Sequence, residues 1–391
     1  MKTGGIIITG LICFLIFTCA PLQAQQGTDE EEQASPLDES TPLFPVSKYG
    51  VAGYIDQTGK MVFWPFSRVM PFSEGMAAVE ALMPGGKWGY IDKTGRVVIK
   101  PQFDEADSFS EGLARVKIGD NATGKYGYTD KTGRLVINPQ FDFATSFSEG
   151  LAMVRVGDVD TGKFGFIDKR GNVVIEPQFT WVESFSDGLA AVKIGGKWGY
   201  IHNTGDLVIE PQFSRANSFS DGLAAVMIGE LMKGEWGFID TTGKFVIEPQ
   251  FPWADSFSDG LAMVKTEHWF SGKCGYIDKT GKMVIDPQFD EAGPFSEGLA
   301  LVTPGNDVNP EGGLSYIDKT GKVVIDLPFL IVGEPFSNGL AKVYPVPGFL
   351  FSPLEPEDWS YIDKTGKYVW GPDLGVLYSD LQLEPGKDDQ S

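Results

Sequence analysis

Apolar and polar positions alternate along most of this chain in short runs that are separated by glycine-rich turns. One stretch has the pattern in full: runs at 189–194, 198–201 and 207–209 are divided by Gly195-Gly196-Lys197 and by a second turn at 202–206. Alternation over so few residues is typical of β-strands with one buried face, and the intervening turn residues are typical of hairpins. The stretch therefore predicts three short antiparallel strands.

The same stretch recurs nine times between residues 43 and 371. Its copies are marked by an aromatic residue, 34 to 45 residues apart, at Tyr54, Tyr90, Tyr128, Phe166, Tyr200, Phe238, Tyr276, Tyr316 and Tyr361. A lone three-stranded unit is too small to be stable in water, so each copy must bury its second face against a neighbour. We predict an all-β fold of tandem three-stranded antiparallel units that form either an open superhelical array or a propeller-like ring.

The first copy departs from the pattern, since Leu43-Phe44-Pro45-Val46 replaces its first run and Val51-Ala52-Gly53 replaces a Trp-Gly pair. Atypical end copies are expected where an array has capped ends. A ring would instead need its first and last copies to pair. The ends therefore slightly favour the open array.

Individual positions of the repeat carry further predictions. The turn after the second run is Asp92-Lys93-Thr94-Gly95 or a close variant, in which Asp accepts backbone N–H groups and Gly takes the left-handed conformation of a bulged hairpin. The third run has valine at its centre in all nine copies while its flanks vary in size, which predicts a tightly packed valine side. The recurring phenylalanines, such as Phe103 and Phe109, are expected to fill the space between neighbours.

Residues 87–99, Lys-Trp-Gly-Tyr-Ile-Asp-Lys-Thr-Gly-Arg-Val-Val-Ile, are followed by Pro-Gln-Phe at 101–103 and by Phe-Ser-Glu-Gly-Leu-Ala at 109–114. This sequence resembles the bacterial WG repeat, also called the KWG repeat, over about residues 46 to 371. The resemblance implies a β-rich repeat array and supplies no catalytic or ligand residue. The tryptophan of the motif is replaced in four copies, by Tyr126, Phe164, Cys274 and Leu314.

The ends of the chain differ in character from the repeats. Residues 1–24 read as a signal peptide, with an apolar core from Ile6 to Phe17 and a cleavage site that leaves Gln25 as the first mature residue. We favour cleavage over a retained anchor or a lipid on Cys19, which would be the two routes to membrane contact. The protein is thus expected to be exported, to the periplasm, the cell surface or the medium. Residues 25–42 predict an acidic disordered tether and 372–391 a C-terminal tail.

Charge and residue usage limit the chemistry. The formal net charge of −21 repels phosphate backbones, so we expect no nucleic acid partner. Cys274 is the one cysteine after the signal, which leaves no internal disulfide. The two histidines, His202 and His268, are too few for a three-histidine metal site, and each turn offers one Asp where calcium wants about six oxygens. We expect no metal, no cofactor and no enzymatic activity.

Departures from the repeat mark candidate binding residues. The position two residues after Pro-Gln-Phe is charged in Glu105, Arg215 and Glu291 but aromatic in Phe143, Trp181 and Trp253. Phe143 and Trp181 belong to adjacent copies and could form one platform for a sugar or an apolar side chain. The alternative is that these rings cap the groove between copies.

Two long insertions between the first and second runs form the other candidate set. They place His268, Trp269 and Phe270 in one loop and Phe349 and Phe351 in another. Insertions at one repeat position project from one side of an array, often its binding side. The alternative is that these loops cover the last sheet edge.

These features favour an exported, non-catalytic repeat scaffold that binds a protein or a cell-envelope polymer through one loop-rich side. Two other classes stay open: a glycan-active enzyme with paired carboxylates, and a purely structural spacer.

Overall fold

The computed structural model describes residues 40–48, 50–82, 85–230, 233–268, 270–305, 313–328, 331–345 and 359–372. All of them belong to one compact unit, Asp38–Ser391. The expected signal peptide, nearly all of the tether and the tail beyond residue 372 lie outside the described residues. The part of the chain that is described contains no helix capable of spanning a membrane.

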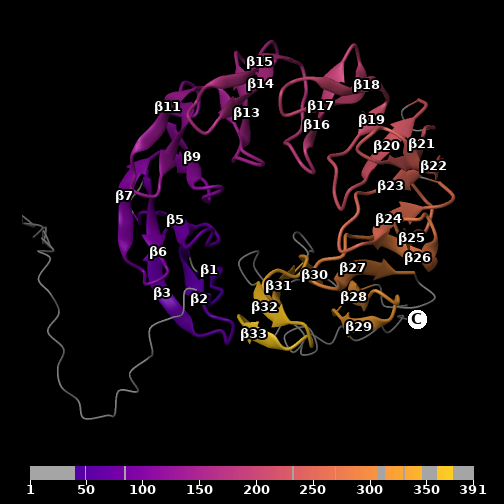
Figure 1. Cartoon of the computed structure of the whole chain (residues 1–391). Coiled ribbons are helices and arrows are strands. Elements are labelled where there is room, and N and C mark those ends of the chain that lie inside the picture. The colour runs from indigo at the N-terminus through magenta and orange to yellow at the C-terminus, as the bar shows by residue number, and fades with distance from the viewer. Residues whose placement is uncertain are drawn as a thin grey trace, which may run out of the picture. The chain divides into compact units, whose positions relative to one another are not determined.

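Strands form in nine consecutive repeats, numbered here in chain order (Figure 1). The first three repeats contain β1 (Phe44–Lys48), β2 (Val51–Ile55) and β3 (Met61–Phe66); β4 (Arg68–Val69), β5 (Met76–Glu80), β6 (Trp88–Asp92) and β7 (Val97–Phe103); and β8 (Glu105–Ala106), β9 (Leu113–Ile118), β10 (Lys125–Asp130) and β11 (Leu135–Phe141). Repeats 4 to 6 contain β12 (Phe143–Ala144), β13 (Leu151–Val156), β14 (Lys163–Asp168) and β15 (Val173–Phe179); β16 (Leu189–Ile194), β17 (Lys197–His202) and β18 (Leu207–Phe213); and β19 (Arg215–Ala216), β20 (Ala224–Ile228), β21 (Glu235–Ile239) and β22 (Phe245–Phe251). The last three contain β23 (Trp253–Ala254), β24 (Ala262–Lys265), β25 (Cys274–Ile277) and β26 (Met283–Ala292); β27 (Leu299–Pro304), β28 (Ser315–Asp318) and β29 (Val323–Asp326); and β30 (Ile331–Gly333), β31 (Leu340–Pro345), β32 (Ser360–Asp363) and β33 (Tyr368–Trp370).

Each repeat is a small antiparallel sheet, which confirms the predicted all-β repeat fold. The three predicted strands are present, and most repeats add a leading strand of two residues, such as β8, that pairs with the end of the inner strand. In repeat 5 a bridge from Val182 to Val192 takes its place. β26 runs unbroken from repeat 7 into repeat 8 and so joins two repeats in one seven-stranded sheet.

The Trp-Gly pair needs glycine because the outer strand crosses it closely. A Cβ atom on Gly89 would lie 2.4 Å from the carbonyl oxygen of Ile99 and 2.7 Å from the nitrogen of Pro101. Such distances are below any tolerated contact, and a side chain here would push the outer strand away. The glycine therefore fixes how the middle and outer strands meet.

The hydrophobic core lies between neighbouring repeats. One cluster joins Tyr128 and Phe141 of repeat 3 to Phe147 and Val154 of repeat 4, and the other clusters combine neighbours in the same way. In the described part of the chain, eight aromatic pairs with ring centroids 4.8 to 4.9 Å apart each link one repeat to the next: Tyr54–Phe72, Tyr90–Phe109, Tyr128–Phe147, Phe166–Phe185, Tyr200–Phe219, Phe238–Phe257, Tyr276–Phe295 and Tyr316–Phe336. The recurring phenylalanines do fill the space between neighbours, as predicted.

The prediction about the central valine of the outer strand is wrong. Val98 is 36% exposed and Val246 is 45% exposed, whereas the isoleucines that follow them are buried. The isoleucine packs on the turn of the next repeat: a Cβ on Gly133 would lie 3.1 Å from the side chain of Ile99. An exposed strand position still favours a β-branched residue, which accounts for valine there without tight packing.

Loops with the pattern Phe-Ser-x-Gly link each repeat to the next. The Ser73 hydroxyl donates a 2.7 Å hydrogen bond to the carbonyl of Phe109, and the following Glu74 accepts one from the N–H of Gly112 at 3.1 Å. Glu74 has φ of 52° and precedes Gly75 with φ of 81°, which together form a two-residue hairpin turn that is costly for a residue other than glycine. The pair of bonds, called here the loop link, offsets that cost.

The loop link recurs between most consecutive repeats. Among the described residues, seven serines donate to the next loop at 2.7 to 2.9 Å: Ser73, Ser110, Ser148, Ser186, Ser220, Ser258 and Ser296. Seven acidic residues accept from the next glycine: Glu74, Glu111, Glu149, Asp187, Asp221, Asp259 and Glu297. Turn lysines such as Lys131 and Lys364 add ion pairs of 3.1 Å to Glu74 and Glu297, so the repeats are held together at the surface as well as in the core.

The first and last repeats pack against each other. Phe44, Val46 and Ile55 share one buried cluster with Leu340, Trp359 and Tyr361. The Tyr361 hydroxyl donates to the carbonyl of Pro45 at 3.1 Å. At this seam the usual lysine and acid become Gln57 and Asn338, joined by a 3.4 Å hydrogen bond.

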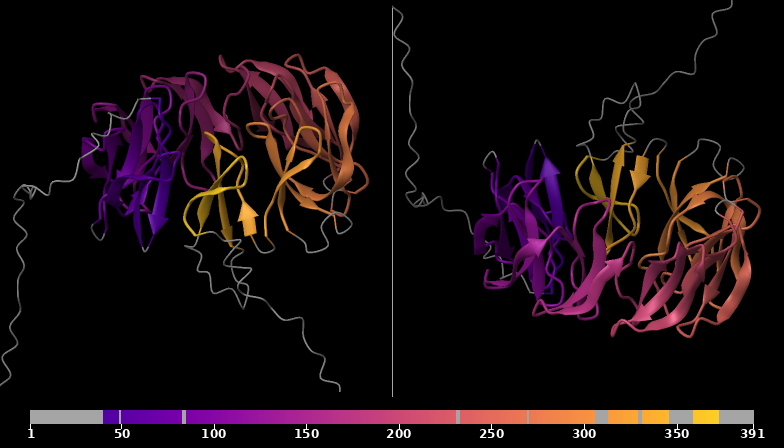
Figure 2. Two further views of the ribbon diagram at one scale, coloured as in Figure 1. Left: turned by 90° about the horizontal axis from the view of Figure 1, so that it is seen from below. Right: turned by 90° about the horizontal axis from the view of Figure 1, so that it is seen from above.

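The described repeats therefore succeed one another in a propeller-like ring of separate small sheets rather than in a closed barrel (Figures 1 and 2). Figure 1 has β5, β9, β13 and β16 toward the inside and β7, β11, β15 and β18 on the outside. The slight preference for an open array was wrong, because the atypical first repeat is shaped for the seam and not for a free end.

The turn chemistry predicted from sequence is confirmed. Asp92 Oδ1 accepts hydrogen bonds from the Thr94 amide at 3.0 Å, the Thr94 hydroxyl at 2.6 Å and the Arg96 amide at 3.1 Å. In repeat 5 His202 occupies this position and is exposed, as expected of a structural turn residue. The backbone turn is kept, but the three bonds to a carboxylate oxygen are not.

Replacing His202 with Asp should restore those bonds. We expect His202→Asp to raise the free energy of unfolding by about 1 kcal/mol, measured by urea denaturation. The reverse change in a matching turn, Asp240→His, should lower it by a similar amount. No gain from His202→Asp together with no loss from Asp240→His would contradict this account of the turn.

The turn carboxylates also make the stability of the folded protein depend on pH in the acid range. The hydrogen bond from Thr132 lowers the pKa of Asp130 in the folded protein, and the corresponding threonines do the same for Asp278 and Asp318. The unfolded chain thus binds protons more readily, and the stabilisation present above the unfolded pKa of about 4 is lost as pH falls through the folded pKa. The urea midpoint should stay level from about pH 7 to 5 and drop below about pH 4. Asp130→Asn should make the drop shallower, and an equally steep drop in that variant would contradict the assignment.

Candidate binding groove

Each repeat carries a row of three side chains across its leading, inner and middle strands. In repeat 2 the register places Arg68 opposite Glu80, and Glu80 opposite Trp88. The third position is that of the Trp-Gly tryptophan. This cross-strand row varies from repeat to repeat, although the backbone around it does not.

In repeats 2 and 3 the charges of the row neutralise each other. Arg68 donates two hydrogen bonds to Glu80, at 2.7 and 3.0 Å, and its guanidinium lies 5.2 Å from the Trp88 ring centroid. In repeat 3 Glu105 accepts from Lys117 at 2.9 Å and from the Tyr126 hydroxyl at 2.9 Å. The charged side chains of these two rows therefore have their partners within the same row.

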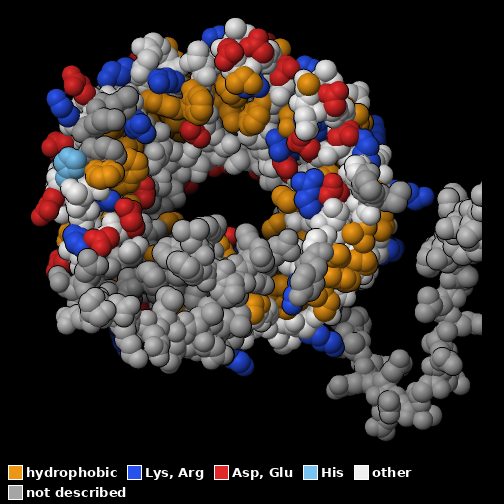
Figure 3. All heavy atoms as spheres, turned by 180° about the vertical axis from the view of Figure 1, so that it is seen from behind, with side chains coloured by type: hydrophobic (Ala, Val, Ile, Leu, Met, Phe, Trp, Pro, Cys, Tyr) orange, Lys and Arg blue, Asp and Glu red, His pale blue; other side chains and the backbone are white. Residues whose placement is uncertain are grey.

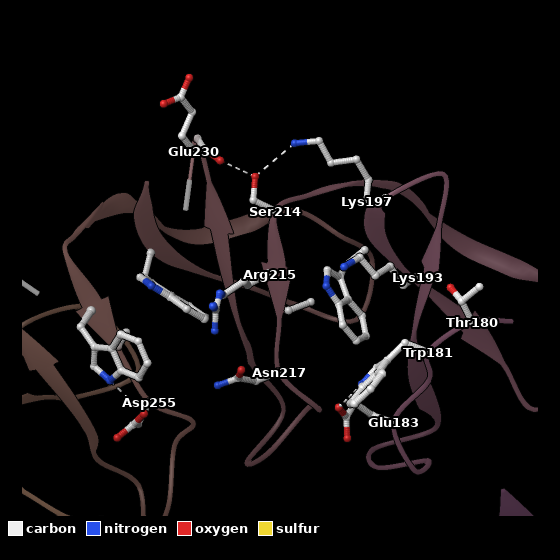
Figure 4. A pocket seen from close by; sticks show the side chains of 17 residues that line it. Thr180, Trp181, Glu183, Lys193, Lys197, Ser214, Arg215, Asn217, Glu230 and Asp255 are labelled. Carbon is white, nitrogen blue, oxygen red and sulfur yellow. Dashed lines mark hydrogen bonds between the residues drawn. The ribbon is translucent and has the colours of Figure 1, made fainter. Parts of the chain in front are cut away.

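The rows of repeats 5, 6 and 7 each contain at least one tryptophan and border one groove. Its volume is about 1100 Å³, and four tryptophans line it: Trp181, Trp198, Trp236 and Trp253. Arg215 and Asn217 of repeat 6 lie at its centre, between Trp181 on one side and Asp255 on the other (Figure 4). Figure 4 also shows Ser214 at the rim with a hydrogen bond from Lys197, which is 3.1 Å long.

The tryptophan rings are held in position by their own strands. Trp181 donates its indole N–H to Glu183 at 3.2 Å, and Trp253 donates to Asp255 at 3.1 Å. Trp253 also packs on the buried Trp236, with ring centroids 5.6 Å apart. Because the N–H groups are already engaged, the rings have their faces left to offer a ligand, and Trp181 is 55% exposed.

The electrostatics of the groove are mixed. Its charged lining residues are Glu183, Lys193, Lys197, Arg215, Glu230 and Asp255. Burial raises the pKa of Asp255, with Glu291 adding to the rise, while the hydrogen bond from Trp253 opposes it. Lys193 lies 5.9 Å from the Trp198 ring centroid.

The structure brings together two of the aromatic residues that the sequence singled out, Trp181 and Trp253, at the same groove. The expected platform of Phe143 with Trp181 is not part of it. Phe143 packs instead edge-on against Phe164 of its own repeat at 6.1 Å, and the Arg155 guanidinium lies within 5.8 Å of both ring centroids. Its ring is partly buried against these neighbours from the same sheet.

Of the loop candidates, the described His268 and Phe270 are not among the lining residues of this groove. His268 Nδ1 accepts a 3.2 Å hydrogen bond from the Phe270 amide, and Phe270 is 75% exposed. Trp269, Phe349 and Phe351 lie outside the described residues. Sequence reasoning missed Trp198 and Trp236, because the repeat motif itself accounts for a tryptophan at their positions. The available signal was that the leading position is aromatic on both sides of Arg215.

A second groove, of about 710 Å³, lies at the seam between the first and last repeats. Its cations are engaged: Arg68 pairs with Glu80, and Lys342 lies 4.3 Å from the Trp359 ring centroid.

Within the described ranges, no group of three or more His, Cys, Asp or Glu side chains is arranged to hold a metal ion. Figure 3, from the opposite side, has apolar and charged side chains interspersed around a central opening.

The separate small sheets, following one another around a ring, define a propeller-like β-repeat scaffold. The family model of the WG containing repeat matches residues 53–81, 88–121, 126–159, 164–198, 198–231, 236–267, 275–305 and 315–344. These segments make up more than half of the chain, and the protein belongs to the WG-repeat family, as its motifs predicted. No curated protein has a sequence significantly similar to this one.

Solved structures with a similar fold have very different sequences. A eukaryotic initiation factor is 14% identical, with a TM-score of 0.57, and the match covers 84% of this chain and 95% of that one. Dipeptidyl peptidase 4 from Porphyromonas gingivalis is 11% identical, with a TM-score of 0.51 over 80% of this chain and 60% of that one. At these identities the similarity concerns the fold alone.

Cys274 replaces the Trp-Gly tryptophan of repeat 7 and is fully buried. Burial raises the pKa of its thiol to about 11. In a chain that begins at Gln25, where it is the one cysteine, we expect the folded protein to resist a thiol reagent at about pH 8 and to react fully in urea. Rapid labelling without denaturant would contradict an inert, buried thiol.

Proposed function

We propose that this protein is an exported, non-catalytic scaffold that binds a protein or a cell-envelope polymer in the tryptophan-lined groove of repeats 5 to 7. The observation that carries the proposal is the convergence of four tryptophans from three consecutive repeats on one groove. Partly exposed, rigid aromatic surface of this kind is typical of recognition sites.

The repeat scaffold does not require this surface. At the leading position repeats 2 and 3 have Arg68 and Glu105, which form ion pairs within their own rows. Trp181 occupies the same position with 55% of its surface exposed. A large aromatic side chain that is left half in water, where the fold accepts a self-paired charge, is better explained by a ligand than by stability.

The non-catalytic part of the proposal is supported by how the carboxylates are used. Many described acidic residues recur at the same turn or loop-link position in several repeats, where they hold backbone amides, as Asp92 and Glu111 do. The export part is supported by the apolar segment from Ile6 to Phe17 and its cleavage pattern. An exported scaffold would meet its ligand in the envelope or beyond it.

The double variant Trp181→Ala/Trp253→Ala tests the groove. Its retention on immobilised cell-wall polysaccharide and on envelope extract should fall about ten-fold or more, since two aromatic contacts are lost. Circular dichroism should show the fold unchanged, because Trp181 is half exposed and Trp253, although it packs on Trp236, is itself partly exposed.

Phe270→Ala is the matched control, since it removes an exposed aromatic residue from the loop outside the groove. It should be retained like the wild type. Full retention of the double variant would contradict the groove, and a loss confined to Phe270→Ala would place recognition in the loops instead.

A further inference from the structure

Arg215 differs from its counterpart in repeat 2. Both arginines begin a leading strand and face the inner-strand residue of their cross-strand row. Arg68 faces Glu80 and is paired with it, whereas Arg215 faces Met227. Among the described residues the Arg215 guanidinium has no ion pair or hydrogen bond. The fold thus places the same side chain at the same position once with a counter-charge and once without.

A guanidinium without a counter-charge favours an anion from outside the protein. It has five N–H donors in a planar fork, which matches the two oxygens of a carboxylate. Arg215 lies at the centre of the tryptophan-lined groove, and both neighbouring rows contribute aromatic rings to the groove walls (Figure 4). A ligand that satisfies the whole groove therefore needs a carboxylate flanked by flat, weakly polar faces.

Sugar acids meet both requirements, because a pyranose ring presents an apolar face to an aromatic ring and its hydroxyls to polar partners. Trp181 and Trp253 supply the rings, and Asn217 and Ser214 supply polar groups near Arg215. The tryptophan N–H groups are already bonded to Glu183 and Asp255, so stacking is the contact that remains to them.

We propose that the groove binds an acidic glycan with widely spaced carboxylates, one carboxylate pairing with Arg215 and the neighbouring sugar rings stacking on Trp181 and Trp253. This proposal rests on the proposed function and names the ligand class of the same groove.

The spacing of the carboxylates follows from the charge of the protein. With a formal net charge of −21, the protein as a whole repels a densely charged anionic polymer or an acid-rich peptide. Within the groove, Glu183, Glu230 and Asp255 alternate with Lys193, Lys197 and Arg215. Arg215 offers one unpaired cation at the centre. A chain that alternates a uronic acid with a neutral sugar matches a groove in which cations and acids are mixed, on a protein that is acidic overall.

The test uses the full chain and a hyaluronan oligosaccharide, which alternates glucuronic acid with N-acetylglucosamine, in titration calorimetry. Its carboxyl-reduced form, a galacturonic acid oligomer and a glutamate-rich peptide are the comparison ligands. The wild type should bind the hyaluronan oligosaccharide best. Arg215→Gln should weaken that binding about ten-fold or more and leave the reduced form unaffected, because charge-assisted hydrogen bonds are among the strongest.

Arg68→Gln is the matched control, since it removes the paired arginine at the same position of repeat 2, and it should bind like the wild type. Equal binding of the reduced form, or no effect of Arg215→Gln, would overturn the acidic-glycan proposal even if Trp181→Ala still weakened binding, in which case the groove itself would stand. Tighter binding of the glutamate-rich peptide would replace the glycan by a peptide ligand. If Trp181→Ala changed the binding of none of these glycans, both the acidic-glycan ligand and the groove as a glycan site would be contradicted.

Discussion

The loop link between consecutive repeats is the constraint on which the rest of the structure depends. Its serine and its acidic residue, such as Ser73 and Glu74, complete the hydrogen bonds of the next loop, and the aromatic pair beneath it completes the core. A repeat taken alone would lack both partners, so its left-handed acidic residue would be strained and its Tyr or Phe exposed. Stability is thus a property of neighbours, and the seam through Tyr361 and Pro45 gives every described repeat two of them.

Because the contacts between repeats use other positions, the residues of the cross-strand rows can vary. The links, the core and the turns use positions that recur, whereas the rows lie beside them and carry ion pairs in repeats 2 and 3 but tryptophans in repeats 5 and 7. A groove built from three rows can acquire a ligand without any change in the scaffold. The same logic explains why Arg68 is neutralised and Arg215 is not: the row partner differs, and the backbone does not.

Much of the fold was predictable from the sequence, because its period and turn chemistry are local. The Asp-x-Thr-Gly turns and the phenylalanines between repeats follow from residues a few positions apart. The seam between the first and last repeats was not predictable. Gln57 and Asn338 are 281 residues apart, and in the sequence each is only a departure from the usual lysine or acidic residue of the repeat. The prediction for the central valine was wrong because a residue that is the same in every copy need not be buried: Val98 and Val246 are exposed. The groove was seen only in part: Trp181 and Trp253 stood out, but Trp198 and Trp236 matched the motif and seemed fully explained by it.

Amide hydrogen exchange of the full chain, followed by mass spectrometry, tests the central claim that every repeat is held by two neighbours. If the ring is closed, the middle strands of repeats 1 and 9, β2 and β32, should exchange as slowly as those of the central repeats and in one cooperative step with them. Protection that declines steadily from the central repeats toward both ends would mean that the end repeats fray, as in an open array, and would contradict the account.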